Sequence, residues 1–296
     1  TTSCVLSIGS IDVSGTNSGA YVLTKSGNGT LAITGSSGAG FGGGVSLTGG
    51  ILQVGHNNAL GTGTLTVAAS TLQAINGDRV LPNAVSVSTG GGITFSGSQS
   101  LTLNGLITFT AINGPTNNIA AGKLLTFQGG INIYSGTLTS PSVIDLQGSG
   151  DTLVSGNIFQ SGTSGNRNVQ VSNAGVTTFS GSNSYAGSTI VSAGVLKLDS
   201  ATALPGGNLN IQAGGIVGLG SGNSMFTRAI GSGTGQVNLT AGSGFAAYGS
   251  DATLDFGGVG ASGTVSMNSL TFGHTTADRT VVLANNWNLS ANTRTA

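Results

Sequence analysis

The sequence has very little charge. Its 296 residues include 8 Lys and Arg against 8 acids, which is 5% charged, and all eight acids are Asp. A typical soluble domain is about one quarter charged. Eight cations are too few for a basic nucleic-acid-binding surface, so we expect no nucleic-acid partner. Because charge repulsion normally keeps protein surfaces apart, its near absence indicates a tendency to self-associate.

Other scarcities exclude further classes of protein. Good helix formers such as Glu, Lys and Met are rare, which disfavours a helical fold. With four Pro and no Gly at every third position, the chain is not collagen-like. No run of 18 apolar residues is present, so we expect no transmembrane segment. The one cysteine, Cys4, cannot form an internal disulfide, but it could join two chains in an oxidising compartment.

The start of the chain is Thr1-Thr2-Ser3-Cys4, without Met or a basic stretch. We interpret it as a mature or trimmed product.

What is abundant is Gly, with 54 residues, together with Ser, Thr, Asn and 38% hydrophobic residues. Two 27-residue segments align without a gap, Phe41 to Val67 and Tyr185 to Ile211. Self-similarity of this kind is typical of repeat architectures.

A shorter period lies within these segments. A small residue, usually Gly, precedes a short strand in which apolar residues alternate with others, at intervals of about 20 residues. Each unit is too short to bury its own apolar face, so equivalent strands must stack in parallel. We expect Leu31, Leu52, Leu72 and Leu196 to form one internal ladder.

The pattern predicts an all-β fold, a right-handed parallel β-helix with turns of roughly 20 residues. We expect roughly 15 turns and a rod on the order of 70 Å long. A stack of β-sandwiches is the alternative. We expect residues 1–296 to form a single continuous solenoid, with protruding loops near 111–122, 220–235 and 257–263.

Two stretches resemble the autotransporter-associated β-strand repeat: LTKSGNGTLAITG, Leu23 to Gly35, and the segment from Thr177 to Ile211. The copy that begins at Phe41 has Phe in place of Tyr and lacks the Asn before it. The resemblance implies a bacterial surface or secreted β-helix with an adhesive or scaffolding role. The residues that we assign to the structural repeat are Gly27, Gly29, Leu31, Gly50, Leu52, Gly63, Leu65, Tyr185, Gly187, Gly194, Leu196, Leu198, Gly207 and Leu209.

Some β-helices are polysaccharide-active enzymes, so the Asp residues are candidate catalytic groups. Asp251 and Asp255 would lie about 13 Å apart on one strand, further than a catalytic carboxylate pair. Asp145 and Asp151 flank a turn without an evident partner base. Asp78-Arg79 and Asp278-Arg279 are more typical of a turn or a local ion pair. We therefore predict no catalytic residue and no enzymatic activity.

Ligand sites are weakly indicated. Gly148 to Leu153 has the wrong Gly-to-Asp offset for a calcium-binding repeat, and His56 and His274 have no metal-ligating neighbours. The pairs Thr64/Thr66, Thr108/Thr110 and Thr137/Thr139 suggest an ice-binding face, but they do not recur at the 20-residue period. We predict no metal and no cofactor.

The preferred functional hypothesis is a non-enzymatic, extracellular structural protein, a β-helical subunit of a bacterial surface fibre, filament or sheath. An uncapped β-helix ends in open strand edges, which can stack head to tail on another copy. The residues that we assign to the assembly ends are Val5, Ile11, Val13, Val281, Leu283, Trp287 and Leu289. The alternative is a monomeric autotransporter-type passenger adhesin that binds glycans or surfaces, with Tyr134, Tyr185 and Tyr248 as candidate contacts. A polysaccharide-active enzyme is the third.

Overall fold

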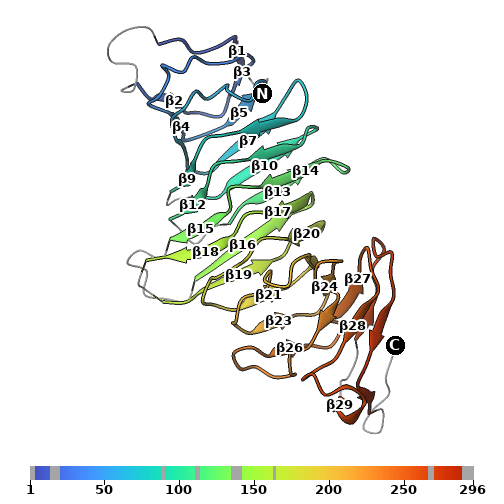
Figure 1. Ribbon diagram of the computed structural model, residues 1–296. Coiled ribbons are helices and arrows are strands. Elements are labelled where there is room, and N and C mark those ends of the chain that lie inside the picture. Colours follow the sequence, from blue (N-terminus) through green and yellow to red (C-terminus); the bar gives the residue numbers. More distant parts are fainter. Residues whose placement is uncertain are drawn as a thin grey trace.

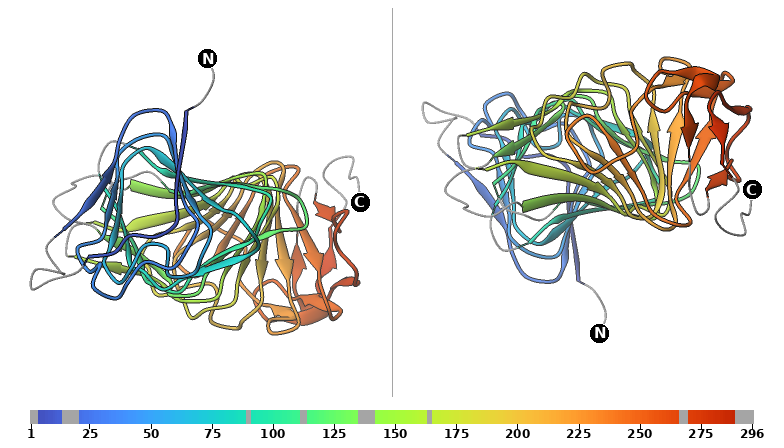
Figure 2. Two further views of the ribbon diagram at one scale, coloured as in Figure 1. Left: turned by 90° about the horizontal axis from the view of Figure 1, so that it is seen from above. Right: turned by 90° about the horizontal axis from the view of Figure 1, so that it is seen from below.

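A computed structural model describes residues 4–13, 21–88, 91–110, 114–134, 142–162, 165–265 and 270–288. The chain winds into a coil of short parallel strands from the N-terminus at one end to the C-terminus at the other (Figure 1). Seen from above and from below, successive turns of the chain wind around an enclosed interior (Figure 2). The described residues contain one short 3₁₀ helix, η1 (Gly260–Ser262), and no α-helix. The prediction of an all-β parallel solenoid is confirmed.

Three parallel sheets run along the coil, and a few short strands extend it at the C-terminal end. Sheet I contains β1 (Val5–Ile8), β3 (Thr30–Ile33), β5 (Ile51–Val54), β7 (Ser70–Ala74), β10 (Ile93–Gly97), β13 (Thr116–Ile119), β16 (Ser142–Gly148), β19 (Arg167–Val171), β21 (Thr189–Val191), β23 (Leu209–Ile211) and β26 (Val237–Leu239). Sheet II contains β8 (Arg79–Leu81), β11 (Leu101–Leu103), β14 (Leu124–Phe127), β17 (Asp151–Val154), β20 (Val176–Phe179), β22 (Gly194–Leu198), β24 (Gly215–Leu219), β27 (Gly244–Ala247) and β30 (Thr271–Phe272). Sheet III contains β2 (Leu23–Lys25), β4 (Val45–Leu47), β6 (Leu65–Val67), β9 (Val85–Val87), β12 (Ile107–Phe109), β15 (Ile131–Tyr134) and β18 (Ile158–Ser161). The C-terminal strands are β25 (Met225–Phe226), β28 (Ala252–Leu254) and β31 (Val281–Leu283) in one sheet, and β29 (Thr264–Val265) with β32 (Asn286–Trp287) in another.

The length of one turn varies. Successive strands of sheet I are paired at intervals from 20 residues, Val169 to Thr189, to 31 residues, Thr116 to Gln147. The coil has about 10 turns of about 23 residues, so the prediction of roughly 15 turns is wrong. Ten spacings of about 4.8 Å give an axial length of about 50 Å, not 70 Å.

Inward side chains form ladders, because alternate residues of each strand point to the same side of a sheet. Leu31, Leu52 and Leu72 are paired in register on β3, β5 and β7 and are buried. The prediction that Leu196 continues this ladder is wrong, because β22 lies in sheet II, where Leu196 is paired with Val217.

The misplaced Leu196 reflects how the two 27-residue segments are arranged. In the first, β4, β5 and β6 lie in sheets III, I and III. In the second, β21, β22 and β23 lie in sheets I, II and I. Equivalent strands of the two segments therefore lie in different sheets: the middle strand is in sheet I in the first segment and in sheet II in the second. The corner that follows the middle strand lies between sheets I and III in the first and between sheets II and I in the second.

Glycine is required where the middle strand of each segment begins. Gly50 and Gly194 both have positive φ values, +67° and +63°. A Cβ atom at Gly194 would lie 1.9 Å from the Asn173 carbonyl oxygen, and one at Gly50 would lie 2.4 Å from the Gly27 carbonyl oxygen. No L side chain fits such a contact, so both glycines fix the path of the chain.

The three stretches that we expected as loops contain ordered elements. Strand β13 lies within 111–122, β25 within 220–235 and η1 within 257–263. Residues 111–113 lie outside the described part of the chain.

Candidate functional site

The N-terminal end of the coil exposes apolar side chains. Strand β1 is paired with β3 along one edge, and no described residue pairs with its other edge. Val5 and Leu6 are 58% and 60% exposed. Ile11 and Val13, which we also assigned to this end, are half-buried against the core.

A hollow of about 370 Å³ lies at this end, and Leu6, Ile8 and Leu23 line it. Cys4 also lines the hollow, and its side chain is exposed.

The C-terminal end is better packed. Val281 and Leu283 lie on β31 and pack against the core, whereas Val282 between them is 49% exposed. The Trp287 ring lies edge-on to the Phe272 ring, with centroids 5.9 Å apart. Leu289 lies outside the described residues. On β31 the exposed apolar residue is therefore Val282, whereas Val281 and Leu283, which we assigned to the assembly end, are half-buried.

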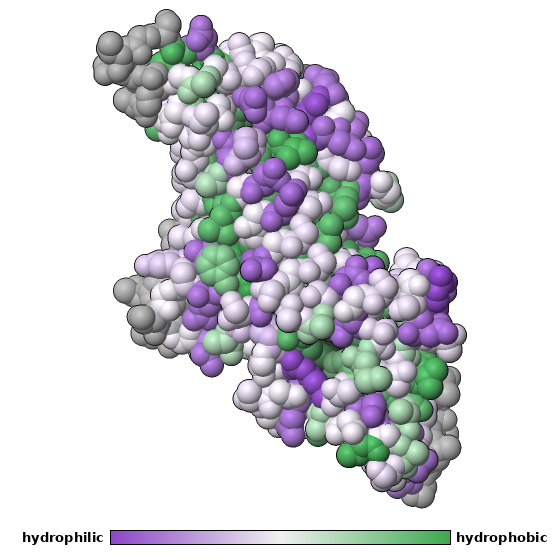
Figure 3. All heavy atoms as spheres, viewed as in Figure 1, coloured by the Kyte–Doolittle hydropathy of each residue, from purple (hydrophilic) through white to green (hydrophobic). Residues whose placement is uncertain are grey.

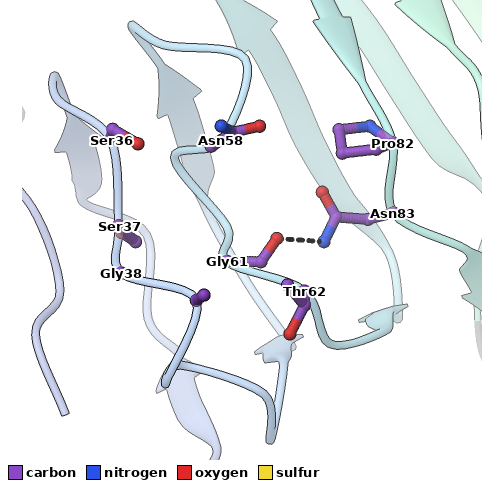
Figure 4. A pocket seen from close by; sticks show the side chains of 9 residues that line it. Ser36, Ser37, Gly38, Asn58, Gly61, Thr62, Pro82 and Asn83 are labelled. Atoms are coloured by element: carbon purple, nitrogen blue, oxygen red, sulfur yellow. Dashed lines mark hydrogen bonds between the residues drawn. The ribbon is translucent and has the colours of Figure 1, made fainter. Parts of the chain in front are cut away.

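A larger hollow, of about 460 Å³, lies on the side of the coil near the first repeat (Figure 4). Ser36, Asn58, Thr62 and Pro82 line it together with Asn83. The Asn83 amide nitrogen donates hydrogen bonds to the carbonyl oxygens of Gly61 and Gly63, at 3.1 and 2.7 Å. These bonds fix the orientation of the amide, because a flipped amide would place its oxygen against two carbonyl oxygens. The amide nitrogen of Asn83 thus ties two turns together.

The Asp side chains mostly link adjacent turns. The Asp151 carboxylate accepts a hydrogen bond from the Val176 amide, and that of Asp251 accepts one from the Thr280 amide, both at 2.9 Å. Asp145 accepts from the Ser172 hydroxyl of the next turn at 2.8 Å, whereas Asp255 accepts from the Gly260 amide of its own turn at 2.7 Å. In the first three of these positions a short carboxylate reaches the backbone or a side chain of the neighbouring turn.

Asp78 has the same role. It accepts from the Ser100 amide at 2.8 Å and from the Lys123 ammonium at 3.1 Å. These hydrogen bonds, the Ser100 amide first, lower the pKa of Asp78 below its usual value. Arg279 pairs with Asp278 at 3.6 Å, as the sequence indicated for a local ion pair.

The other candidate groups are not brought together. Among the described residues, no three His, Cys or Asp side chains are close enough to hold a metal ion. In the same part of the chain, no helix is long and apolar enough to cross a membrane. The ring nitrogen Nδ1 of His56 accepts from the Asn58 amide, and that of His274 lies 2.8 Å from the Thr276 hydroxyl.

Two of the three candidate tyrosines are buried. Tyr185 is 1% exposed and its hydroxyl lies 2.6 Å from the Thr189 hydroxyl, while Tyr248 is 9% exposed. Tyr185 and Tyr248 are therefore not available as glycan contacts, because their rings pack against the protein. Tyr134, at the end of β15, is 45% exposed.

Threonine and serine hydroxyls align on the outer face of sheet III. Thr66 and Thr108 are both in register with Ser86, so the hydroxyl column recurs when serine is counted. Ser88 and Thr110, two residues further along, donate hydrogen bonds to carbonyl oxygens of the preceding turn. Thr137 and Thr139 lie outside the described residues.

Two cations that no sequence motif pointed to lie against backbone carbonyl oxygens, Lys25 buried and Arg228 half-buried. Lys25 is 8% exposed, and its ammonium donates to the carbonyl oxygens of Ser26, Gly27 and Gly49 at 2.9–3.0 Å. Arg228 lies in a hollow beside the corner of the second segment. No sequence signal separates these two cations from the others, because Lys123 also lacks an adjacent acid and pairs with Asp78 through the fold.

On the side of the molecule seen in Figure 3, hydrophobic residues form separate spots among polar ones.

The passenger-associated-transport-repeat family model matches residues 23–54 and 171–198. Searches of curated proteins and of solved structures found no match. The matched residues cover β2 to β5 in the first segment, and the end of β19 to β22 in the second. Repeats of this family imply an autotransporter passenger-type β-helix and suggest a surface or secreted protein. The chain is thus a parallel β-solenoid, and two of its stretches, residues 23–54 and 171–198, match the passenger-associated-transport-repeat, in agreement with the resemblance to the autotransporter-associated β-strand repeat.

Proposed function

We propose that this protein is a non-enzymatic, extracellular structural subunit that stacks end to end into a fibre, filament or sheath at a bacterial surface. The observation that carries the proposal is the N-terminal end. There, β1 offers an edge with no partner among the described residues, next to the exposed side chains of Val5 and Leu6.

The geometry of the coil favours this mode of assembly. Every strand pair in the three long sheets is parallel, so a further strand along β1 would continue sheet I at the same spacing of about 4.8 Å. A second copy stacked on β1 would bury Leu6 and the adjoining hollow. Because Leu6 is in register with Leu31, this contact would extend the internal ladder of the coil. Stacking one end on the opposite end of another copy is a heterologous contact, which generates open filaments.

The surface chemistry also favours assembly. The chain has a formal net charge of zero and few charged residues, so electrostatic repulsion between copies is weak. Val282 exposes an apolar side chain on β31 at the other end. We infer that the end with β1 packs on the end with β31.

A second candidate is a monomeric passenger adhesin that binds glycans or surfaces. The exposed Tyr134 ring at the end of β15 favours it, because aromatic rings stack on sugar faces. The two candidates differ in whether purified protein polymerises.

Electron microscopy of the 296-residue protein separates them. We expect filaments whose power spectrum contains an approximately 4.8 Å layer line. A charge at an edge strand blocks pairing, so Leu6→Asp and Val282→Asp should each abolish filaments. Thr66→Asp, on the exposed outer face of sheet III, is the matched control and should leave them intact. Isolated rods of wild-type protein at high concentration would contradict assembly and favour the adhesin.

A further inference from the structure

Arg228 occupies an unusual position for a cation. It follows β25, and its guanidinium lies beside the corner formed by residues 199–207 of the preceding turn. Nη1 donates to the Gly207 carbonyl oxygen at 2.6 Å, and Nη2 donates to the Pro205 carbonyl oxygen at 2.5 Å. The side chain is half-buried.

No acid neutralises this cation in the part of the chain that the structure describes. The three ion pairs there involve Lys123, Lys197 and Arg279. Burial lowers the pKa of Arg228. The titratable group that acts on it is the Tyr185 phenol, which carries no charge at ordinary pH because burial raises its pKa. A partly desolvated charge is costly unless an opposite charge or further hydrogen bonds compensate it.

Lys25 provides an internal comparison. Its ammonium has three N–H donors, and three carbonyl oxygens accept them. A guanidinium has five N–H donors in a planar fork, and two carbonyl oxygens accept from that of Arg228. Lys25 is thus satisfied by the fold, whereas Arg228 retains donors for another group.

Those donors adjoin a hollow of about 140 Å³. Asn223 and Thr227 add an amide and a hydroxyl to its wall, and Leu204 and Met225 add apolar surface. Met225 is 59% exposed, so the hollow opens to solvent beside an apolar rim. Its size suits one small anionic group, and its mixed rim suits the hydroxyls and C–H faces of a sugar ring.

We propose that the hollow at Arg228 binds one carboxylate or sulfate group of an acidic polysaccharide. The planar guanidinium matches such an oxyanion in a bidentate manner. Nucleic acid fits less well, because its dense phosphates need many cations and none of the other residues lining this hollow is basic. The site lies on the side of the coil and does not depend on the assembly proposed above.

Calorimetric titration of the 296-residue protein at low salt tests the site with three probes. These are oligogalacturonate, which carries carboxylates, sulfated dextran oligomers, and neutral dextran oligomers. We expect binding to at least one anionic probe, weakening as salt is added, and none to neutral dextran. Preference between the two anionic probes identifies which group the site takes.

Variants locate the binding. Arg228→Gln should weaken binding of the anionic probe at least tenfold. Arg279→Gln, which removes an exposed and paired cation, should leave the affinity unchanged. Because Arg228 also holds two carbonyl oxygens, Asn223→Asp serves as a second variant: it keeps those bonds, adds a negative charge to the hollow and should weaken binding similarly. Thermal melts check that each variant folds. Undiminished binding in Asn223→Asp, equal binding of neutral dextran, or no binding of either anionic probe would overturn the proposal.

Discussion

The two repeat copies solve the same packing problem with different side chains. Ser37, just ahead of the first copy, accepts a hydrogen bond from the Ile11 amide of the preceding turn, at 3.0 Å, and donates to the Ala59 carbonyl oxygen of the next, at 2.6 Å. Asn183 in the second copy accepts from the Ile158 amide at 2.7 Å and donates to the Ala203 carbonyl oxygen at 2.6 Å. Both side chains are buried and each bridges three turns.

The corner aromatic residues differ in a matching way. Phe41 and Tyr185 are both 1% exposed. Tyr185 places its hydroxyl against Thr189, and the residue equivalent to Thr189 in the first copy is Val45, which is also buried. The comparison teaches that the repeat conserves contacts between turns rather than residue types, since a buried polar group is accepted where a partner accompanies it.

The largest expected effect is the loss of either corner aromatic ring. Phe41→Ala and Tyr185→Ala should each lower the free energy of unfolding by about 3–5 kcal/mol, because a fully buried ring leaves a cavity. Urea unfolding followed by circular dichroism measures both. If the first copy tolerated the change with a loss below about 1 kcal/mol, the two corners would not be equivalent.

The next largest effect is expected at the glycines where the middle strands begin. Gly50→Ala and Gly194→Ala should each cost about 2–4 kcal/mol, because a side chain at positive φ is strained and its Cβ meets a carbonyl oxygen. The effect should be greater at Gly194, where the contact is shorter. Gly206→Ala is the control, since no atom lies within 4 Å of its added Cβ and its φ is not positive. Equal melting temperatures for Gly194→Ala and Gly206→Ala would refute the steric argument.

The third largest effect is expected at the side chains that bridge three turns, Asn183 and Ser37. Asn183→Ala leaves a buried amide and a buried carbonyl without their partner and should cost about 2–4 kcal/mol. Ser37→Ala removes the equivalent bonds, but Ile11 lies on the half-exposed first turn, where water can replace the lost partner, so we expect about 1–2 kcal/mol. Hydrogen exchange should show faster exchange of the Ile158 amide in Asn183→Ala. Unchanged protection of that amide would show that Asn183 does not hold it.

The solenoid itself was predictable from the sequence, because the alternation of residues such as Leu52 and Val54 with Gln53 specifies a strand with one buried face. Which sheet each strand joins was not, because the corners vary and one turn spans 20 to 31 residues. Leu196 was placed in the wrong ladder for this reason.

The sites were less predictable still. Ser37 has the role of Asn183 through contacts between turns, which sequence spacing does not reveal. The hollow at Arg228 depends on carbonyl groups of residues 205 and 207, and their positions follow from the fold of the corner.

The smallest expected effect is a difference in alkaline stability between the two copies. Burial raises the pKa of the Tyr185 phenol above its usual value of about 10. The folded protein therefore keeps the proton where the unfolded chain releases it, so stability is fully present below pH 10 and falls as the pH rises above it. The slope approaches about 1.4 kcal/mol per pH unit for one group.

Phe41 has no such group, so Tyr185→Phe should remove this contribution. Urea unfolding at pH 9 and pH 11 should show wild type losing about 1–1.5 kcal/mol more than Tyr185→Phe. Burial also raises the pKa of Tyr248. Tyr248 is present in both proteins, so its contribution to the pH dependence cancels in this comparison. The mirror variant, Phe41→Tyr with Val45→Thr, places the same pair in the first copy and should gain the alkaline loss that Tyr185→Phe removes. If wild type and Tyr185→Phe lost equal stability between the two pH values, the Tyr185 hydroxyl would have to be open to solvent in the folded protein, and the equivalence of the two buried corners would fail.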